Sequence, residues 1–156
     1  MPERTKPPFR ADHVGSLIRP EALIKARERA DKGELRAAEL KEIQQAAIRD
    51  VVRMQEEIGL KVVTDGEFNR HSWHRDFMLK FANVSLVPSK MKVRFHTAEG
   101  DRENSAPALK VTGKIARPGN GGIFVDDLKF LVSVAHATPK ITIPSPTVMH
   151  FRGGRE

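Results

Sequence analysis

Cysteine is absent from this chain of 156 residues. Without cysteine, the chain has no disulfide framework and no thiol of its own that could act as a nucleophile. Enzymes and small scaffolds that depend on either device are therefore excluded as descriptions of this chain.

Long apolar runs are also missing. Nowhere does the sequence contain the roughly 18 consecutive apolar residues that a membrane-spanning helix needs. The first residues, Met1 to Lys6, are followed by two prolines and not by the apolar region of a secretion signal. We therefore expect a soluble cytoplasmic protein without a membrane partner.

Acidic residues are fewer than basic ones, with 20 Asp and Glu against 27 Lys and Arg, which gives a net charge of +7. Basic proteins often bind nucleic acid through a concentrated patch. Here residues 21–60 are nearly balanced, and part of the excess lies in Lys90, Lys92 and Arg94. No helix-turn-helix, zinc-finger or RNA-recognition pattern accompanies them. We therefore predict no nucleic-acid partner, and attraction of an acidic substrate is the alternative use of the charge.

One short run joins a buried-strand pattern to two carboxylates. Val62 and Val63 suit a buried strand, and Gly66 allows a sharp turn just after it. Asp65 and Glu67 would then lie at the carboxyl end of the strand, where α/β folds, and (β/α)8 barrels above all, keep their chemistry. The alternative is that these carboxylates merely cap the next helix. On spacing alone both interpretations stay open.

A second cluster repeats this design near the amino terminus. Residues 9–13 are predicted as a short strand that ends in a tight turn, and Pro20 opens a helix where its missing N–H costs nothing. His13, Gly15 and Ser16 are therefore expected on the same rim as the two carboxylates. An isolated histidine is more often structural than catalytic, and only the second strand end nearby makes His13 a candidate.

The remaining patterns predict an alternation of strands and helices. Residues 20–30 are expected to form a helix, and an apolar stripe with spacings of three and four predicts another over residues 34–58. Gly59 then supplies a left-handed cap. We further expect helices over residues 72–82 and 126–136, and strands over residues 61–64 and 140–143.

Later in the chain the period changes to two. Met91, Val93 and Phe95 alternate with Lys, Arg and His, which predicts a half-exposed strand. Residues 109–115 suggest a second strand, and the polar residues 99–104 would form the loop between them. We interpret this segment as a β-hairpin inserted between strand–helix units.

A rigid loop is expected after the last of these strands. Pro144 and Pro146 remove backbone donors, so the segment cannot continue a central strand. Ser145 and Thr147 are therefore predicted on a rim loop.

Two other patterns imitate ligand sites. His71 and His74 could form a metal site with a carboxylate nearby, but a spacing of three near a helix start is common by chance. Residues 117–122 are rich in glycine, yet they lack the Lys-Ser/Thr of a nucleotide loop and its strand-to-helix context. We therefore predict no metal site at the first position and a plain turn at the second.

Three separated blocks, in order and spanning nearly the whole chain, resemble the catalytic domain of cobalamin-independent methionine synthase. They are Arg10-Ala11-Asp12-His13-Val14-Gly15-Ser16-Leu17-Ile18-Arg19-Pro20, Thr64-Asp65-Gly66-Glu67-Phe68-Asn69-Arg70 with Ser72-Trp73 and Asp76-Phe77, and Pro139-Lys140-Ile141-Thr142-Ile143-Pro144-Ser145-Pro146-Thr147 with His150-Phe151-Arg152. The resemblance implies an α/β fold, a partial (β/α)8 TIM barrel with about three of the eight strands and an inserted β-hairpin. Because a complete barrel typically needs about 250 residues, we expect residues 1–156 to be the amino-terminal portion of a single, longer barrel domain.

The resemblance also implies a cofactor. In this family, zinc held by one His, two Cys and one Glu converts a bound thiol to the thiolate. Those ligands are expected beyond residue 156, so we expect zinc in the complete family protein and no metal or cofactor on this chain alone.

The activity implied by the resemblance is methyl transfer from a methyltetrahydrofolate-type donor to a thiol such as homocysteine. The family pattern puts contacts to the amino acid at Gly15 and Ser16 and binding of its ammonium group at Glu67, while rim geometry adds His13 and Asp65. The candidate substrate-binding residues are His13, Gly15, Ser16, Asp65, Glu67 and Ser145.

Two alternatives remain. The chain is a thiol alkyl transferase that acts on another substrate, for example an epoxide opened by a thiol cofactor, or it is an inert or split fragment. In the latter case it would self-associate or pair with the other half of the barrel.

Overall fold

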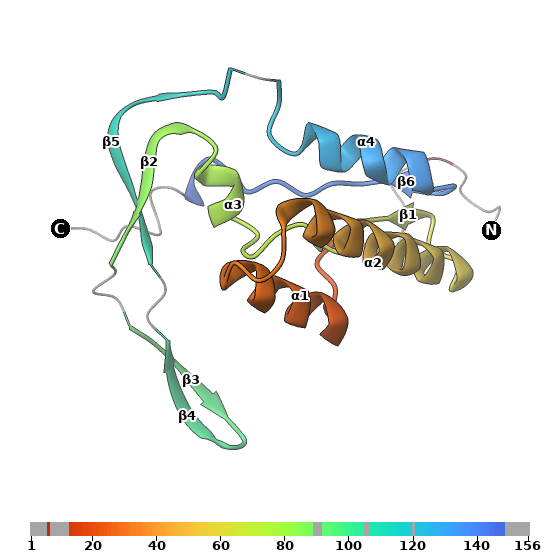
Figure 1. The fold of residues 1–156 in the computed structure, drawn as a ribbon, viewed down its shortest axis with the longest axis horizontal. Helices are drawn as coiled ribbons and strands as arrows, with labels where there is room; N and C mark the ends of the chain where they lie inside the picture. Colours follow the sequence, from red (N-terminus) through yellow and green to blue (C-terminus); the bar gives the residue numbers. More distant parts are fainter. Residues whose placement is uncertain (1–5, 7–12, 89–91, 105–106, 120, 149–156) are drawn as a thin grey trace. The chain divides into compact units, whose positions relative to one another are not determined.

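The computed structural model describes residues 6, 13–88, 92–104, 107–119 and 121–148. The chain divides into two compact units, a first unit of residues 1–71 and 124–142 and a second unit of residues 72–123 and 143–156. Figure 1 shows the elements along the chain, which are α1 (Glu21–Asp31), α2 (Ala37–Glu57), β1 (Val62–Val63), α3 (Arg75–Met78), β2 (Ala82–Val87), β3 (Val93–Thr97), β4 (Gly100–Asn104), β5 (Ala108–Ala116), α4 (Val125–Val134) and β6 (Thr138–Pro139). The α/β class predicted from the sequence is confirmed.

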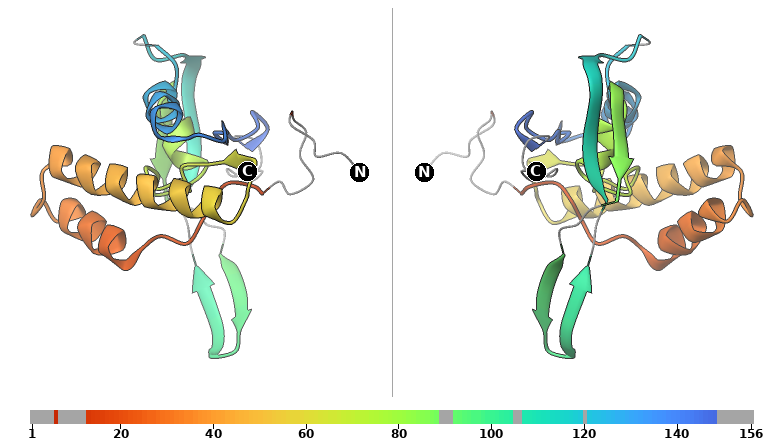
Figure 2. Two further views of the ribbon diagram at one scale, coloured as in Figure 1. Left: turned by 90° about the vertical axis from the view of Figure 1, so that its right-hand side faces the viewer. Right: turned by 90° about the vertical axis from the view of Figure 1, so that its left-hand side faces the viewer.

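In its described residues, the first unit contains a parallel strand pair, β1 with β6, and the helices α1, α2 and α4. Val62 lies opposite Thr138 and Val63 opposite Pro139. One further bond runs from the Lys140 N–H to the Val63 carbonyl, at 2.9 Å. Helices α1 and α2 lie side by side, as Figures 1 and 2 both show. The parallel pair is the kind of sheet that (β/α) units build, while its place in a larger barrel stays a prediction.

The apolar stripe of the second helix forms the core of the first unit. Ile48 and Val52 are 0% and 1% exposed, and they pack with Val63 of β1. Burying each such side chain contributes about 1.5–3 kcal/mol. At the start of α2, the Glu39 carboxylate accepts the Arg36 N–H at 3.0 Å and so satisfies a donor that the helix leaves free. The helices expected over residues 20–30, 34–58 and 126–136 are confirmed, with ends shifted by one to three residues.

The second unit is built from two antiparallel pairs, β2 with β5 and β3 with β4. The helix expected over residues 72–82 is confirmed only for Arg75–Met78. Its last residue, Ala82, instead begins the strand Ala82–Val87. The expected loop over residues 99–104 is also wrong, since Gly100–Asn104 is β4. The sequence 82–87 is strand because Leu86 pairs across with Leu109, a partner far along the chain.

Polar residues hold the β3–β4 hairpin together. Charged side chains face each other across it, with His96 Nδ1 2.6 Å from Asp101 Oδ1 and Lys92 Nζ 2.6 Å from Glu103 Oε1. Phe95, expected on a covered face, is 52% exposed. Its described side chains therefore support the hairpin by charge, in addition to the backbone pairing, and not through a buried face.

Two expectations concern strand ends. The last strand was expected over residues 140–143 and instead occupies Thr138–Pro139, because these are the two residues that pair with Val62 and Val63 of the short strand β1. Of the predicted strand over residues 9–13, only His13 lies within the described residues, and it belongs to no helix or strand. Lys90, Met91 and residues 150–152 also lie outside them. None of the helices in the described parts of the chain has the length and apolar character needed to cross a membrane.

Candidate functional site

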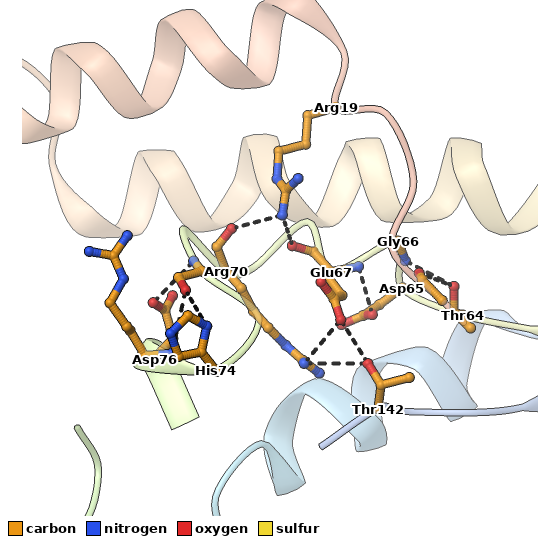
Figure 3. Close-up of polar contacts among 12 residues, drawn as sticks. Arg19, Thr64, Asp65, Gly66, Glu67, Arg70, His74, Asp76 and Thr142 are labelled. Carbon is orange, nitrogen blue, oxygen red and sulfur yellow. Dashed lines mark hydrogen bonds and ion pairs between the residues drawn. The ribbon is translucent and has the colours of Figure 1, made fainter. Parts of the chain in front are cut away.

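The turn after β1 is a buried polar segment (Figure 3). Asp65, Glu67 and Arg70 are 2%, 4% and 1% exposed. Burying charges is costly unless they are paired and hydrogen-bonded. The capping alternative is wrong, because the next helix begins only at Arg75, with His74 as its N-cap. The carboxylates instead belong to a compact charged turn.

The backbone of this turn is held from outside. Glu67 has a φ of +60°, a conformation that non-glycine residues seldom adopt. Arg19 donates from Nη2 to the carbonyls of Glu67 and Arg70, at 3.2 and 3.3 Å. The Leu17 N–H donates to the Gly66 carbonyl at 3.1 Å. A strained residue that its surroundings fix in this way is typical of functional sites.

The two oxygens of the Glu67 carboxylate differ in their partners. Its Oε1 accepts a hydrogen bond from the Thr142 hydroxyl at 2.8 Å and lies 3.5 Å from Arg70 Nη1. The Arg70 guanidinium lies over the Phe124 ring, 4.1 Å from its centroid, which fixes its plane. Among the described residues, Oε2 of Glu67 has no partner. This oxygen is free to accept a hydrogen bond from a ligand.

Asp65 shapes the turn. Its Oδ1 accepts the Glu67 N–H at 3.0 Å, a local bond typical of Asx turns. Its Oδ2 is buried without a partner among the described residues. Burial raises the pKa of the Asp65 carboxyl above its usual value, against the opposing effect of the bond from Glu67.

We expect Asp65→Asn to stabilise the protein at neutral pH by about 1 kcal/mol, because it removes a partly unpaired buried charge and keeps the acceptor for the Glu67 N–H. A carboxyl whose folded pKa is raised lowers stability as the pH rises from its unfolded pKa through its folded pKa. The gain should therefore vanish in acid, below the ordinary aspartate pKa. Urea unfolding at a series of pH values measures the free energy of unfolding of Asp65→Asn and of the exposed control Asp31→Asn. The same dependence on pH in both variants would contradict the prediction.

The first loop meets this turn. The Thr64 hydroxyl donates to the Gly15 carbonyl at 2.7 Å and accepts the Gly66 N–H at 3.2 Å. Gly15 is buried, whereas Ser16 is exposed. His13 reaches the same strand end through Gln55 of α2, whose Oε1 lies 2.9 Å from His13 Nε2. The structure thus brings His13 and Gly15 to the strand end that carries Asp65 and Glu67.

Ser145 belongs to the second unit. Its hydroxyl lies 2.9 Å from that of Thr147, and both residues are exposed. A place for Ser145 beside Glu67 therefore stays a prediction.

Several residues of the site were missed by sequence reasoning. Arg70 and Thr142 lie inside the blocks that resemble the family, yet nothing in their spacing indicates a contact with Glu67. Gln55 is different, because it is a polar residue four positions after Val51 on the buried stripe of α2. A polar side chain at a core position is a signal that could have identified it.

The described residues do not fit a zinc site. Within them, no three His, Cys, Asp or Glu side chains gather in a way that could hold a metal ion. The sequence also has no cysteine to supply a thiolate. The polar cluster of the first unit can thus bind and orient a ligand by hydrogen bonds and charge, and it offers no metal-ligand set.

Comparison with known proteins gives a consistent result. Residues 9–95 match the family described as "Cobalamin-independent synthase, Catalytic domain". Two uncharacterised proteins of Bacillus subtilis, YxjG and YxjH, are 43% and 41% identical to this chain over 155 and 153 residues. The chain spans only 39% and 38% of their lengths.

Solved structures are similar as well. A candidate vitamin-B12-independent methionine synthase of Listeria monocytogenes is 36% identical, with a TM-score of 0.71 over 94% of this chain and 39% of that chain. A B12-independent methionine synthase of Shewanella, solved in complex with selenomethionine, shares the fold at 24% identity, with a TM-score of 0.57 over 76% of this chain and 33% of that chain.

Proposed function

Because this chain belongs to the family of cobalamin-independent synthase catalytic domains, we propose that it supplies the amino-acid-binding part of a methyltransferase. The enzyme would move a methyl group from a methyltetrahydrofolate-type donor to a thiol such as homocysteine. The observation that carries this proposal is the buried carboxylate of Glu67, held by Thr142 and Arg70 with one oxygen left to accept.

An α-amino acid suits this carboxylate. Its ammonium group carries three donors and a positive charge, and a charge-assisted hydrogen bond in a desolvated site is strong. Thr142 fixes the orientation of the carboxylate before any ligand arrives. The role of Glu67 is therefore to bind the amino group and so to orient the rest of the acceptor.

Orientation is the contribution of this chain to the reaction. In methyl transfer to a thiol, sulfur attacks the methyl carbon while the bond from that carbon to the donor nitrogen breaks. The nitrogen keeps the electron pair, and in the net reaction it gains the proton that the thiol loses. Fixing the amino group limits where the acceptor's sulfur can lie, which lowers the entropic cost of the displacement. Because the zinc ligands that the resemblance implies are expected beyond residue 156, we assign the described residues no step that involves a metal.

A second candidate follows from the coverage of the relatives. The chain spans about two fifths of YxjG and of the Listeria protein. We therefore also consider that these residues act only together with the remainder of a barrel, in the same polypeptide or in a partner. An acceptor thiol other than homocysteine is compatible with either arrangement. Competition between homocysteine and other thiols for methylation would identify the acceptor.

We expect the intact mass of the native protein, measured in its source cells, to exceed 17.5 kDa, the mass of this chain. A larger mass would direct the search for a His-x-Cys, Glu and Cys ligand set to the additional residues. A mass of 17.5 kDa would favour the second candidate with a separate partner chain. It would contradict the expectation that these residues belong to a longer polypeptide.

A further inference from the structure

Gln55 is a buried amide whose orientation is fixed by the backbone. It is 1% exposed on α2. Its Nε2 donates to the carbonyls of Val51 and Thr64, both at 2.9 Å, and its Oε1 accepts the Thr64 N–H at 3.0 Å. A carbonyl can only accept and an N–H can only donate, so the oxygen and the nitrogen of this amide cannot be exchanged.

This orientation determines the tautomer of His13. The same Oε1 of Gln55 lies 2.9 Å from His13 Nε2. Because the amide oxygen only accepts, the hydrogen of the contact belongs to Nε2 of the imidazole. In the neutral ring, Nδ1 is then the nitrogen with the free lone pair.

The Nδ1 atom is in an unusual position for an acceptor. It is buried, and among the described residues it has no hydrogen-bond partner. The backbone of His13 is fixed too, since Lys140 donates from Nζ to its carbonyl. Leaving a buried acceptor unpaired costs about 1–3 kcal/mol, which a donor from a ligand would recover.

We propose that Gln55 is a positioning residue that holds His13 as the Nε2–H tautomer, so that Nδ1 accepts a hydrogen bond from the bound acceptor amino acid. Gln55 bonds to both strand-end segments of the site, to Thr64 after β1 and to His13 in the first loop. One side chain therefore fixes the tautomer of the imidazole together with the strand end that leads to Glu67. The ligand part of this inference rests on the proposed function, whereas the tautomer does not.

The test is nitrogen NMR of the native protein labelled with 15N-histidine, in which the signal of His13 is assigned by its loss in His13→Asn. Long-range proton–nitrogen correlations distinguish the two neutral tautomers. We expect the Nε2–H form for His13 without ligand, and a shift of its Nδ1 signal toward that of a hydrogen-bonded nitrogen on saturation with L-homocysteine.

The variant Gln55→Met keeps the length of the side chain and removes its hydrogen bonds. It should give a mixture of tautomers and weaken L-homocysteine binding about fivefold to tenfold, the effect of about one hydrogen bond. Gln45→Met, a half-buried glutamine on the same helix, is the matched control and should change neither. If Gln55→Met does not fold, the tautomer of His13 in the unchanged protein still tests the role of Gln55.

The outcomes separate the inference from the proposed function. An Nδ1–H tautomer in the unchanged protein would overturn the role of Gln55. Binding of L-homocysteine without a shift of the His13 Nδ1 signal would overturn the ligand contact and leave the proposed function standing. Absence of L-homocysteine binding with the Nε2–H tautomer present would overturn the proposed function and the ligand contact, and it would leave the positioning by Gln55.

Discussion

Replacing Glu67 by glutamine in the native protein is expected to raise the KM for the acceptor amino acid about 10- to 100-fold. Loss of a hydrogen bond between charged groups costs about 1.5–3 kcal/mol, and each 1.4 kcal/mol corresponds to about tenfold in affinity. The amide of glutamine keeps the size of the side chain and its contact with the Thr142 hydroxyl but loses the charge. Initial rates against L-homocysteine concentration measure the effect.

A control is needed because Glu67 also faces a buried guanidinium. Arg70 Nη1 lies 3.5 Å from Glu67 Oε1, and both side chains are almost fully buried. Removing one partner of such a pair destabilises the fold as well. The thermal unfolding of Glu67→Gln should therefore be measured as well, and its kinetics should be determined well below its unfolding temperature. Glu57→Gln, at an exposed carboxylate on α2, should leave the KM unchanged.

The acceptor itself supplies the sharpest comparison. 4-Mercaptobutanoate keeps the thiol and the carboxylate of homocysteine and lacks the ammonium group. If Glu67 binds the ammonium, Glu67→Gln should weaken L-homocysteine binding strongly and hardly change binding of 4-mercaptobutanoate. An equal loss for both compounds would mean that Glu67 acts through the fold and not through the amino group.

The first unit was largely predictable because its signals are local. The stripe that ends near Ile58 marks a helix by its spacing alone, and Val62 and Val63 mark the strand that the helix feeds. The turn at Asp65 and Glu67 was predictable too, because Gly66 follows a buried strand. Spacing alone left open whether its carboxylates cap the next helix.

The second unit was harder because its strands depend on distant partners. Ala82–Val87 has no strong period, and it is a strand because β5, more than twenty residues later, pairs with it. Gly100–Asn104 is so polar that its composition indicates a loop. Its strand is stabilised by cross-strand pairs such as His96 with Asp101, which no local pattern reveals.

Within the site, too, local motifs were predictable and contacts between distant residues were not. Gly15 and Glu67 lie in recognisable motifs. Their neighbours Gln55 and Thr142 come from a helix and from a loop far along the chain. Sequence spacing can place a residue at the end of a strand, but it cannot predict which side chain from another element will complete its hydrogen bonds.

We expect Gly15→Ala to lower the free energy of unfolding by about 2–6 kcal/mol, the sum of backbone strain of about 1–3 kcal/mol and overpacking of similar size. Gly15 has a φ of +127°. A Cβ there would lie 3.1 Å from Thr142 Cγ2 and 3.2 Å from Thr64 Cγ2, so both side chains would have to give way by a few tenths of an ångström. Urea unfolding of the native protein measures the loss.

Two further variants separate the causes of this loss. Gly33 has a φ of +76°, and apart from its chain neighbours no described residue has an atom within 4 Å of the position that a Cβ would take there. Gly33→Ala should therefore show backbone strain alone, about 1 kcal/mol. Thr142→Ser removes the methyl group that Gly15→Ala would strike and keeps the hydroxyl that Glu67 accepts, so Gly15→Ala should cost less in the Thr142→Ser background. Equal losses for Gly15→Ala and Gly33→Ala, with no relief from Thr142→Ser, would mean that the close approach of the first loop to Thr142 does not exist in solution. A relieved double variant would instead establish that this approach, on which the geometry around Glu67 depends, is made by the folded protein.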